Sequence, residues 1–135
     1  MNYTYYVTID PTTPGRLIVQ DSGGIVVASG DDDPQIITWQ LVLPASKPGF
    51  FTGFYWDPNH KPPKGVFGPP KLSSSQLELN LPDHNSRRGQ GWVYQLVALV
   101  DGVPYTTALT SRARPARLPY GPIVYTSGNP TIKNH

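Results

Sequence analysis

A short aromatic, acidic and amide-bearing stretch is the part of this sequence whose residue types best suit ligand chemistry. Tyr55, Trp56, Asp57, Asn59 and His60 follow one another within six positions. Aromatic rings can stack on a sugar ring while carboxylate and amide oxygens bind its hydroxyl groups. Small-ligand sites combine apolar surface with a few polar groups in this way. One hypothesis is therefore a small-molecule site of the carbohydrate-binding kind.

The same stretch continues an aromatic run that begins at Phe50. Side chains alternate between the two faces of a β-strand. A regular strand over residues 51–56 would therefore place Phe51 and Tyr55 on one face, and Phe54 and Trp56 on the other. Aromatic bulk on both faces predicts either that both are covered within the domain, or that one contacts a ligand or another chain.

The charges are divided unevenly along the chain. Residues 1–59 carry a net charge of −4 and residues 60–135 carry +6, although the whole chain has only +2. The basic half includes Arg112, Arg114 and Arg117 in a proline-containing stretch. A basic loop can bind phosphates, but on a nearly neutral protein it more often pairs with acidic groups, so nucleic acid is not the expected partner.

The acidic half of a second copy is a nearer partner for these arginines. We expect the chain to act by binding or self-association as a homo-oligomer. In this hypothesis Phe54, Trp56 and His60 make the contacts, and the arginines supply the electrostatic complement.

The chain offers few residues for catalysis. It has no cysteine, and Glu78 is its one glutamate. It has no nucleophile elbow, phosphate-binding loop or dinucleotide fingerprint. A hydrolase would have to use aspartates, which is a third and weaker hypothesis. The run Asp31-Asp32-Asp33-Pro34 has turn chemistry and lacks the spacing of a calcium loop. We expect no metal, no cofactor and no enzymatic activity.

The elements that carry these residues should be β-strands. Sixteen prolines and thirteen glycines interrupt every helical pattern. Residues 35–43 alternate, with Ile37 and Trp39 on one face. Asp101-Gly102 predicts a hairpin that joins residues 92–100 to residues 103–110. Residues 16–20 and 25–28 flank a second predicted hairpin turn. Residues 1–135 should form a single domain, an all-β antiparallel immunoglobulin-like β-sandwich of about 7–9 strands.

The last third of the chain resembles a known family. Residues 92–102, a hairpin return and the terminal segment of residues 129–134 are similar to the ends of the DP-EP family of small bacterial β-sandwich proteins. They resemble more distantly the PixA/AidA-like inclusion-body proteins. The resemblance implies an immunoglobulin-like sandwich with no established catalytic site, and hence no functional residues to transfer.

The sequence contains no apolar run of the length of a membrane span, and its first residues lack the pattern of a signal peptide. We therefore expect a cytoplasmic protein without a membrane segment.

Overall fold

The computed structural model describes residues 2–20, 25–28, 35–59, 61–84, 91–107 and 130–134. Every regular element among these residues is a β-strand, which confirms the all-β prediction. None of the described residues forms a helix with the length and hydropathy needed to cross a membrane. The strands are β1 (Asn2–Ile9), β2 (Leu17–Val19), β3 (Ile25–Ala28), β4 (Gln35–Leu41), β5 (Gly49–Trp56), β6 (Lys71–Leu72), β7 (Glu78–Asp83), β8 (Gly91–Val100), β9 (Val103–Thr106) and β10 (Thr131–Asn134).

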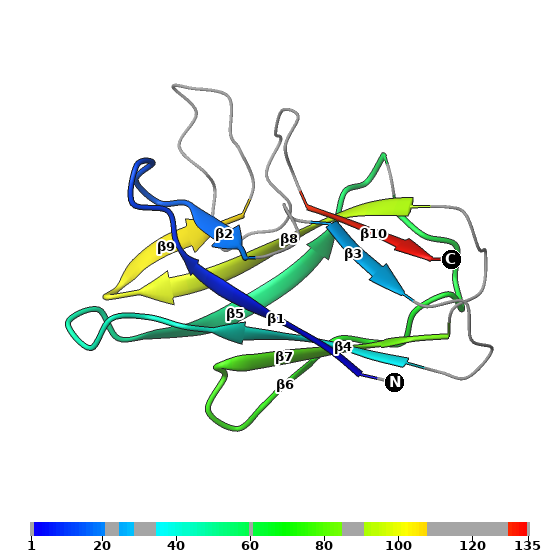
Figure 1. The fold of residues 1–135 in the computed structure, drawn as a ribbon, viewed down its shortest axis with the longest axis horizontal. Helices are drawn as coiled ribbons and strands as arrows, with labels where there is room; N and C mark the ends of the chain where they lie inside the picture. Colours follow the sequence, from blue (N-terminus) through cyan, green and yellow to red (C-terminus); the bar gives the residue numbers. More distant parts are fainter. Residues whose placement is uncertain are drawn as a thin grey trace.

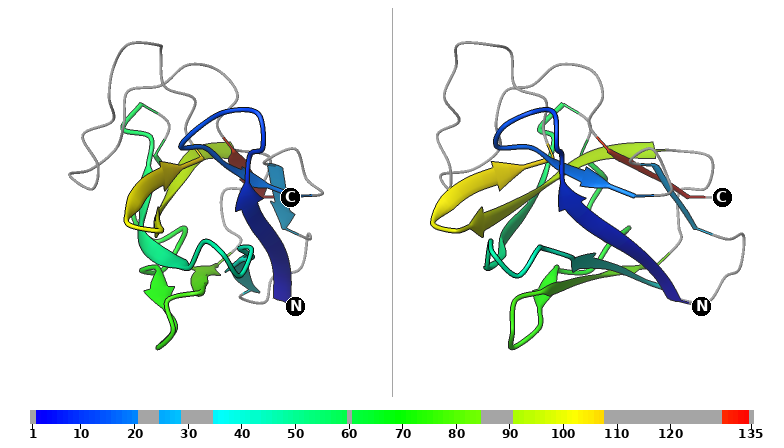
Figure 2. Two further views of the ribbon diagram at one scale, coloured as in Figure 1. Left: turned by 90° about the vertical axis from the view of Figure 1, so that its left-hand side faces the viewer. Right: turned by 60° about the vertical axis from the view of Figure 1, so that its left-hand side comes forward.

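The described strands form two sheets that pack face to face. The first sheet has the order β2-β1-β4-β7-β6. The second has the order β3-β10-β8-β5, and β9 also pairs with β8. The start of β1 and the end of β10 lie at one end of the molecule, and the β8–β9 turn lies at the other (Figure 1). A view from the side shows β1 and β9 in different layers (Figure 2). This arrangement is a β-sandwich.

Two of the eight pairings between described strands are parallel, which corrects the expectation of an antiparallel sandwich. β1 pairs with β4 in parallel, and β3 pairs with β10 in parallel. The other pairings are antiparallel. Parallel neighbours need a crossover connection, so these strands are joined through other elements and not by tight turns. The β1–β4 pairing matters most, because it brings distant outward-facing residues onto one surface.

The two predicted hairpins have different outcomes. Asp101 and Gly102 have φ values of 50° and 75° and join β8 to β9, as a two-residue turn of this type requires. The hairpin predicted for residues 16–20 and 25–28 is wrong, because β2 pairs with β1 and β3 pairs with β10. The β1–β2 connection is held by Asp10, whose N–H donates to the Arg16 carbonyl at 2.9 Å.

The core lies between the two sheets and is built from the side chains that point inward from the strands of both sheets. Period-two alternation places every second side chain of β4 in this space, and its burial pattern follows that period. The buried residues of the central core are Val7, Leu17, Val19, Ile37, Trp39, Leu41, Phe51, Leu79, Leu81, Tyr94, Leu96, Ala98, Val100 and Ile132. Both sheets therefore contribute to one hydrophobic core.

Candidate functional site

The aromatic run of β5 faces the core more completely than regular alternation predicts. A β-bulge shifts the register between Phe51 and Gly53, so that Phe51 pairs with Ala98 but Phe54 pairs with Leu96. The extra residue in a bulge changes which face the following side chains occupy. Phe51 is consequently buried, while Phe54 and Trp56 pack against the same core. The expectation that Phe51 and Phe54 face opposite ways is wrong.

Phe54 and Trp56 belong to a continuous cluster of rings. Phe54 stacks on Tyr94 with ring centres 5.5 Å apart, and it contacts Trp39 at 5.4 Å. Trp56 and Phe54 form a T-shaped pair with ring centres 4.9 Å apart, and Trp56 packs against Phe67 with ring centres 4.9 Å apart. Such pairs add to the stability gained by burial. These two predicted contact residues are thus packing residues of the sandwich.

The other predicted residues of this stretch that the structure describes are Tyr55, Asp57 and Asn59. Tyr55 points to the other side of β5, where an added Cβ on Gly53 would come within 2.9 Å of its ring. Asp57 is buried, and its carboxylate accepts the Asn59 N–H at 3.0 Å. Asn59 itself is exposed. Asp57 therefore stabilises the turn that follows β5.

Four predicted site residues lie outside the described residues. They are His60, Arg112, Arg114 and Arg117.

The best-defined charged contact lies at the β1–β2 connection. The Asp10 carboxylate accepts hydrogen bonds from the Thr12 N–H at 2.9 Å and the Thr12 hydroxyl at 2.8 Å. Arg16 Nη1 lies 3.3 Å from the same carboxylate. The Thr12 N–H, and then the Thr12 hydroxyl and Arg16, hold the Asp10 pKa below its usual value. Among the described residues, no group of three or more His, Cys, Asp or Glu side chains could hold a metal ion.

The outward-facing side of the first sheet is the candidate functional surface, and we call it the outer face. Tyr6, Ile36 and Val42 are 43%, 42% and 46% exposed there. Thr38 and Gln40 lie between Ile36 and Val42 along the strand, and Tyr6 lies beside Gln40, so apolar and polar side chains are mixed on this face. The outward side chains of the face include Thr4, Tyr6, Thr8, Ile18, Ile36, Thr38, Gln40, Val42, Lys71, Glu78, Asn80 and Pro82.

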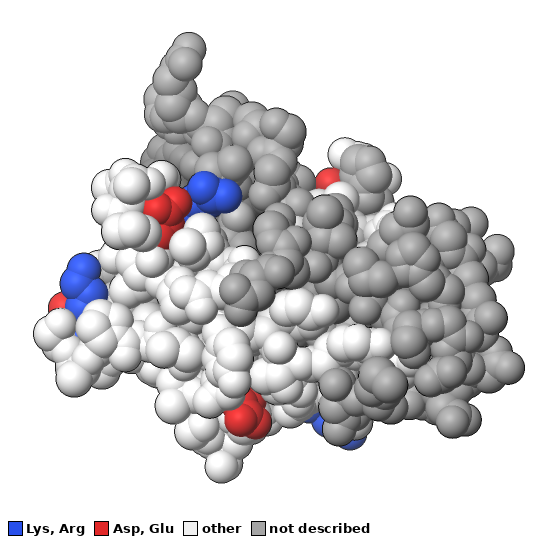
Figure 3. Space-filling model, viewed as in Figure 1, with Lys and Arg blue, Asp and Glu red and all other residues white. Residues whose placement is uncertain are grey.

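Charges lie at the margin of the outer face. Within its described strands the charged outward residues are Glu78, on β7, and Lys71, on the edge strand β6. In the space-filling view the described atoms over β1 and β4 are mostly white, and the red and blue atoms lie nearer the margin (Figure 3). The rows through Thr38 and Gln40 are uncharged on β1 and β4 but end in Lys71 on β6 and Glu78 on β7. The Thr38 hydroxyl donates to Asn80 Oδ1 at 2.6 Å.

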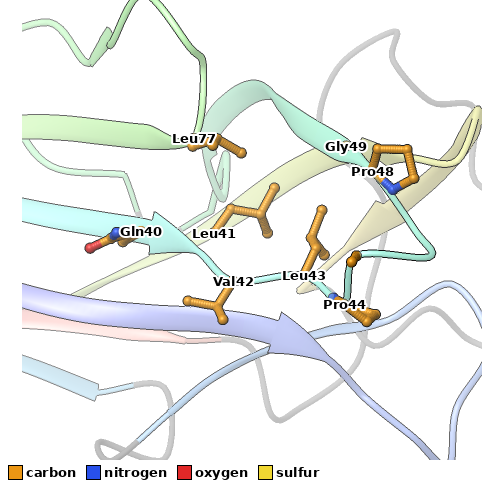
Figure 4. Close-up of a pocket in the computed structure, with 9 residues that line it drawn as sticks. Gln40, Leu41, Val42, Leu43, Pro44, Pro48, Gly49 and Leu77 are labelled. Carbon is orange, nitrogen blue, oxygen red and sulfur yellow. The ribbon is translucent and has the colours of Figure 1, made fainter.

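An apolar depression continues the outer face beyond the end of β4. Its volume is about 460 Å³, and Gln40 and Val42 belong to both features. Leu41 and Leu43 lie between Leu77 on one side and the prolines of the β4–β5 connection on the other (Figure 4). Leu77 is 39% exposed, so the depression opens to solvent beside an apolar side chain. The full lining is Gln40, Leu41, Val42, Leu43, Pro44, Ala45, Pro48, Gly49 and Leu77.

The sequence carries only a partial signal for this surface. Alternation over residues 35–43 assigns Thr38 and Gln40 to the side opposite Trp39, and that assignment is correct. It does not show that Tyr6 lies next to Gln40, because their proximity arises from the parallel β1–β4 pairing. No protein-family model matches this chain, and no curated protein matches it in sequence.

Proposed function

We propose that this chain is a non-enzymatic β-sandwich protein that acts by binding, and that its binding mode is self-association into a homo-oligomer. The observation that carries the proposal is the exposure of Tyr6, Ile36 and Val42 on the same face of the first sheet, where β1 and β4 carry no charged outward residue. Large apolar groups on an exposed face favour contact with another protein surface, because such contact removes them from water. In this proposal the contacts are made by the outer face and not by Phe54 and Trp56, the contact residues expected from the sequence.

Three finer points belong to the same proposal. The immunoglobulin-like type is supported by two packed sheets with a fully buried tryptophan, Trp39, between them. A relationship to the DP-EP family is supported by the succession of β8, the Asp101-Gly102 turn and the final strand β10. A cytoplasmic location is part of the proposal because the sequence has no apolar run of the length of a membrane span.

Light scattering coupled to size exclusion tests self-association directly. The mass should rise with protein concentration and should stay raised at high salt, because apolar contacts are not screened by ions. Loss of the oligomer at high salt would instead support the arginine hypothesis built on Arg112, Arg114 and Arg117. A monomer mass at every concentration would overturn self-association.

The depression supports small-ligand binding as an alternative. Its volume of about 460 Å³ falls within the range of small-molecule pockets, roughly 300–1,000 Å³. Its mainly apolar lining suits an apolar ligand better than a sugar. A titration with ANS, an anionic dye that binds apolar surface, should then saturate, and Leu77→Asn should abolish the signal. An unchanged signal in that variant would exclude the depression as the binding site.

A further inference from the structure

We infer that the partner of the outer face is the outer face of a second copy, packed sheet against sheet around Thr38. This inference rests on the proposed self-association and adds its geometry. β4 is the middle strand of the first sheet, and Thr38 is the middle residue of β4. Thr4 and Asn80 flank Thr38 in register on the two neighbouring strands. Thr38 therefore marks the centre of the face.

The polar side chains around Thr38 can form hydrogen bonds with a second copy of the same surface. Threonine and tyrosine hydroxyls and the amides of Gln40 and Asn80 each both donate and accept hydrogen bonds. Two copies of such a surface can satisfy each other, whereas a row of like charges would repel its own copy. A two-fold axis lying between the sheets keeps the centre of the face opposite itself, as an isologous interface requires.

The margin also favours a second copy. Glu78 and Lys71 carry opposite charges on adjacent strands at the same side of the face. A two-fold axis along β4 sets the β7–β6 side of one copy against the β1–β2 side of the other, so Glu78 and Lys71 would not face the same charges of the second copy. The exposed side chains of Tyr6, Ile36 and Val42 supply the apolar part.

The edges of the first sheet are poor alternatives for association. β2 has three residues and β6 has two, so each offers little backbone for strand addition. Short edge strands are one way in which proteins prevent edge-to-edge pairing. Face-to-face packing, which repeats the geometry already used inside the sandwich, remains the way for this sheet to meet another copy.

The size of the face predicts a weak and reversible dimer. β4 has seven residues, and at ~3.3 Å per residue and ~4.8 Å between strands a five-stranded face covers about 450 Å². The two faces together would bury roughly 900 Å² if they are treated as flat, which is below the ~1,200 Å² buried in stable interfaces. We therefore expect the dimer to dissociate on dilution.

Charge substitutions distinguish this face from other surfaces. Tyr6→Lys places a charge in the face, and Val103→Lys is the matched control on β9 of the second sheet, where Val103 is 52% exposed. Light scattering should show dimers for the wild-type chain and for Val103→Lys, and monomers for Tyr6→Lys with an unchanged melting temperature. Equal dimerisation of all three proteins would show that the outer face is not the interface, while self-association would still hold. A wild-type monomer at every concentration would overturn both.

Cross-linking tests the position of the axis. The chain has no cysteine, so Thr38→Cys and Val103→Cys each carry a single thiol. Cα atoms of facing sheets lie about 10 Å apart, which is too far for a disulfide, so a short bismaleimide is the appropriate reagent. Thr38→Cys should form covalent dimers faster than Val103→Cys after correction for thiol reactivity with a monofunctional maleimide. Equal or slower dimer formation would overturn the Thr38-centred geometry.

Discussion

Trp39 Nε1 donates a hydrogen bond to the Tyr94 hydroxyl at 3.0 Å, and this contact joins the two sheets through the middle of the core. Trp39 lies on β4 and Tyr94 on β8, and both side chains are fully buried. Their rings also contact each other, with centres 5.0 Å apart. A buried indole N–H needs a partner, so the tyrosine hydroxyl allows a tryptophan to occupy this apolar space.

Tyr94→Phe should destabilise the fold. The substitution keeps the ring but leaves the Trp39 N–H without its acceptor, which costs about 1–3 kcal/mol in the free energy of unfolding. Urea unfolding measures the change. Tyr6→Phe, which removes an exposed hydroxyl, is the control and should stay within about 0.5 kcal/mol of the wild type. Equal effects of the two substitutions would show that the Trp39–Tyr94 hydrogen bond contributes nothing.

Stability should fall in alkaline solution because of the same tyrosine. Burial raises the pKa of Tyr94 above its ordinary value, an effect larger than the opposing hydrogen bond from Trp39. The unfolded chain therefore loses this proton first as the pH rises above about 10, and stability falls by up to about 1.4 kcal/mol per pH unit. In urea unfolding at increasing pH, Tyr94→Phe should show a shallower decline. Parallel declines would contradict this role.

Asp10 should contribute to stability only above strongly acidic pH. Its pKa is lowered, chiefly by the Thr12 N–H. A group with a lowered folded pKa stabilises the fold above its unfolded pKa, and this contribution is lost as the pH falls through the folded pKa. Asp10→Asn should therefore melt at a lower temperature than the wild type near neutral pH, and the difference should shrink towards about pH 2. A difference that is constant over this range would contradict the assignment.

Local sequence signals predict several elements of this fold well. Alternation over residues 35–43 predicts β4 and its inward-facing Trp39, because the period of a strand fixes which side chains face the core. Asp101-Gly102 predicts its turn, because both positions need a positive φ. These features depend on residues that are close in the chain, and single-sequence reasoning detects them for that reason.

Long-range features are not predicted in this way. The bulge between Phe51 and Gly53 adds one residue to a strand without any change in composition, so alternation assigns Phe54 to the wrong face. The outer face depends on the parallel pairing of β1 with β4, which places Tyr6 beside Gln40. Nothing in either strand alone specifies its partner. The sequence therefore points to the aromatic run as the candidate site, whereas the fold uses Phe54 and Trp56 of that run for packing.

Trp56→Ala and Tyr6→Ala separate the packing role of the aromatic run from the binding role of the outer face. Trp56 packs against Phe54 and Phe67 but is only partly buried, so its removal should cost about 2–3 kcal/mol of unfolding free energy, below the ~3–5 kcal/mol of a fully buried tryptophan. Tyr6→Ala should leave urea unfolding of the dilute monomer nearly unchanged and should weaken dimerisation in light scattering. If Trp56→Ala keeps the stability of the wild type but loses association, the interface lies at the aromatic run. A residue that serves only in packing cannot be removed without a loss of stability.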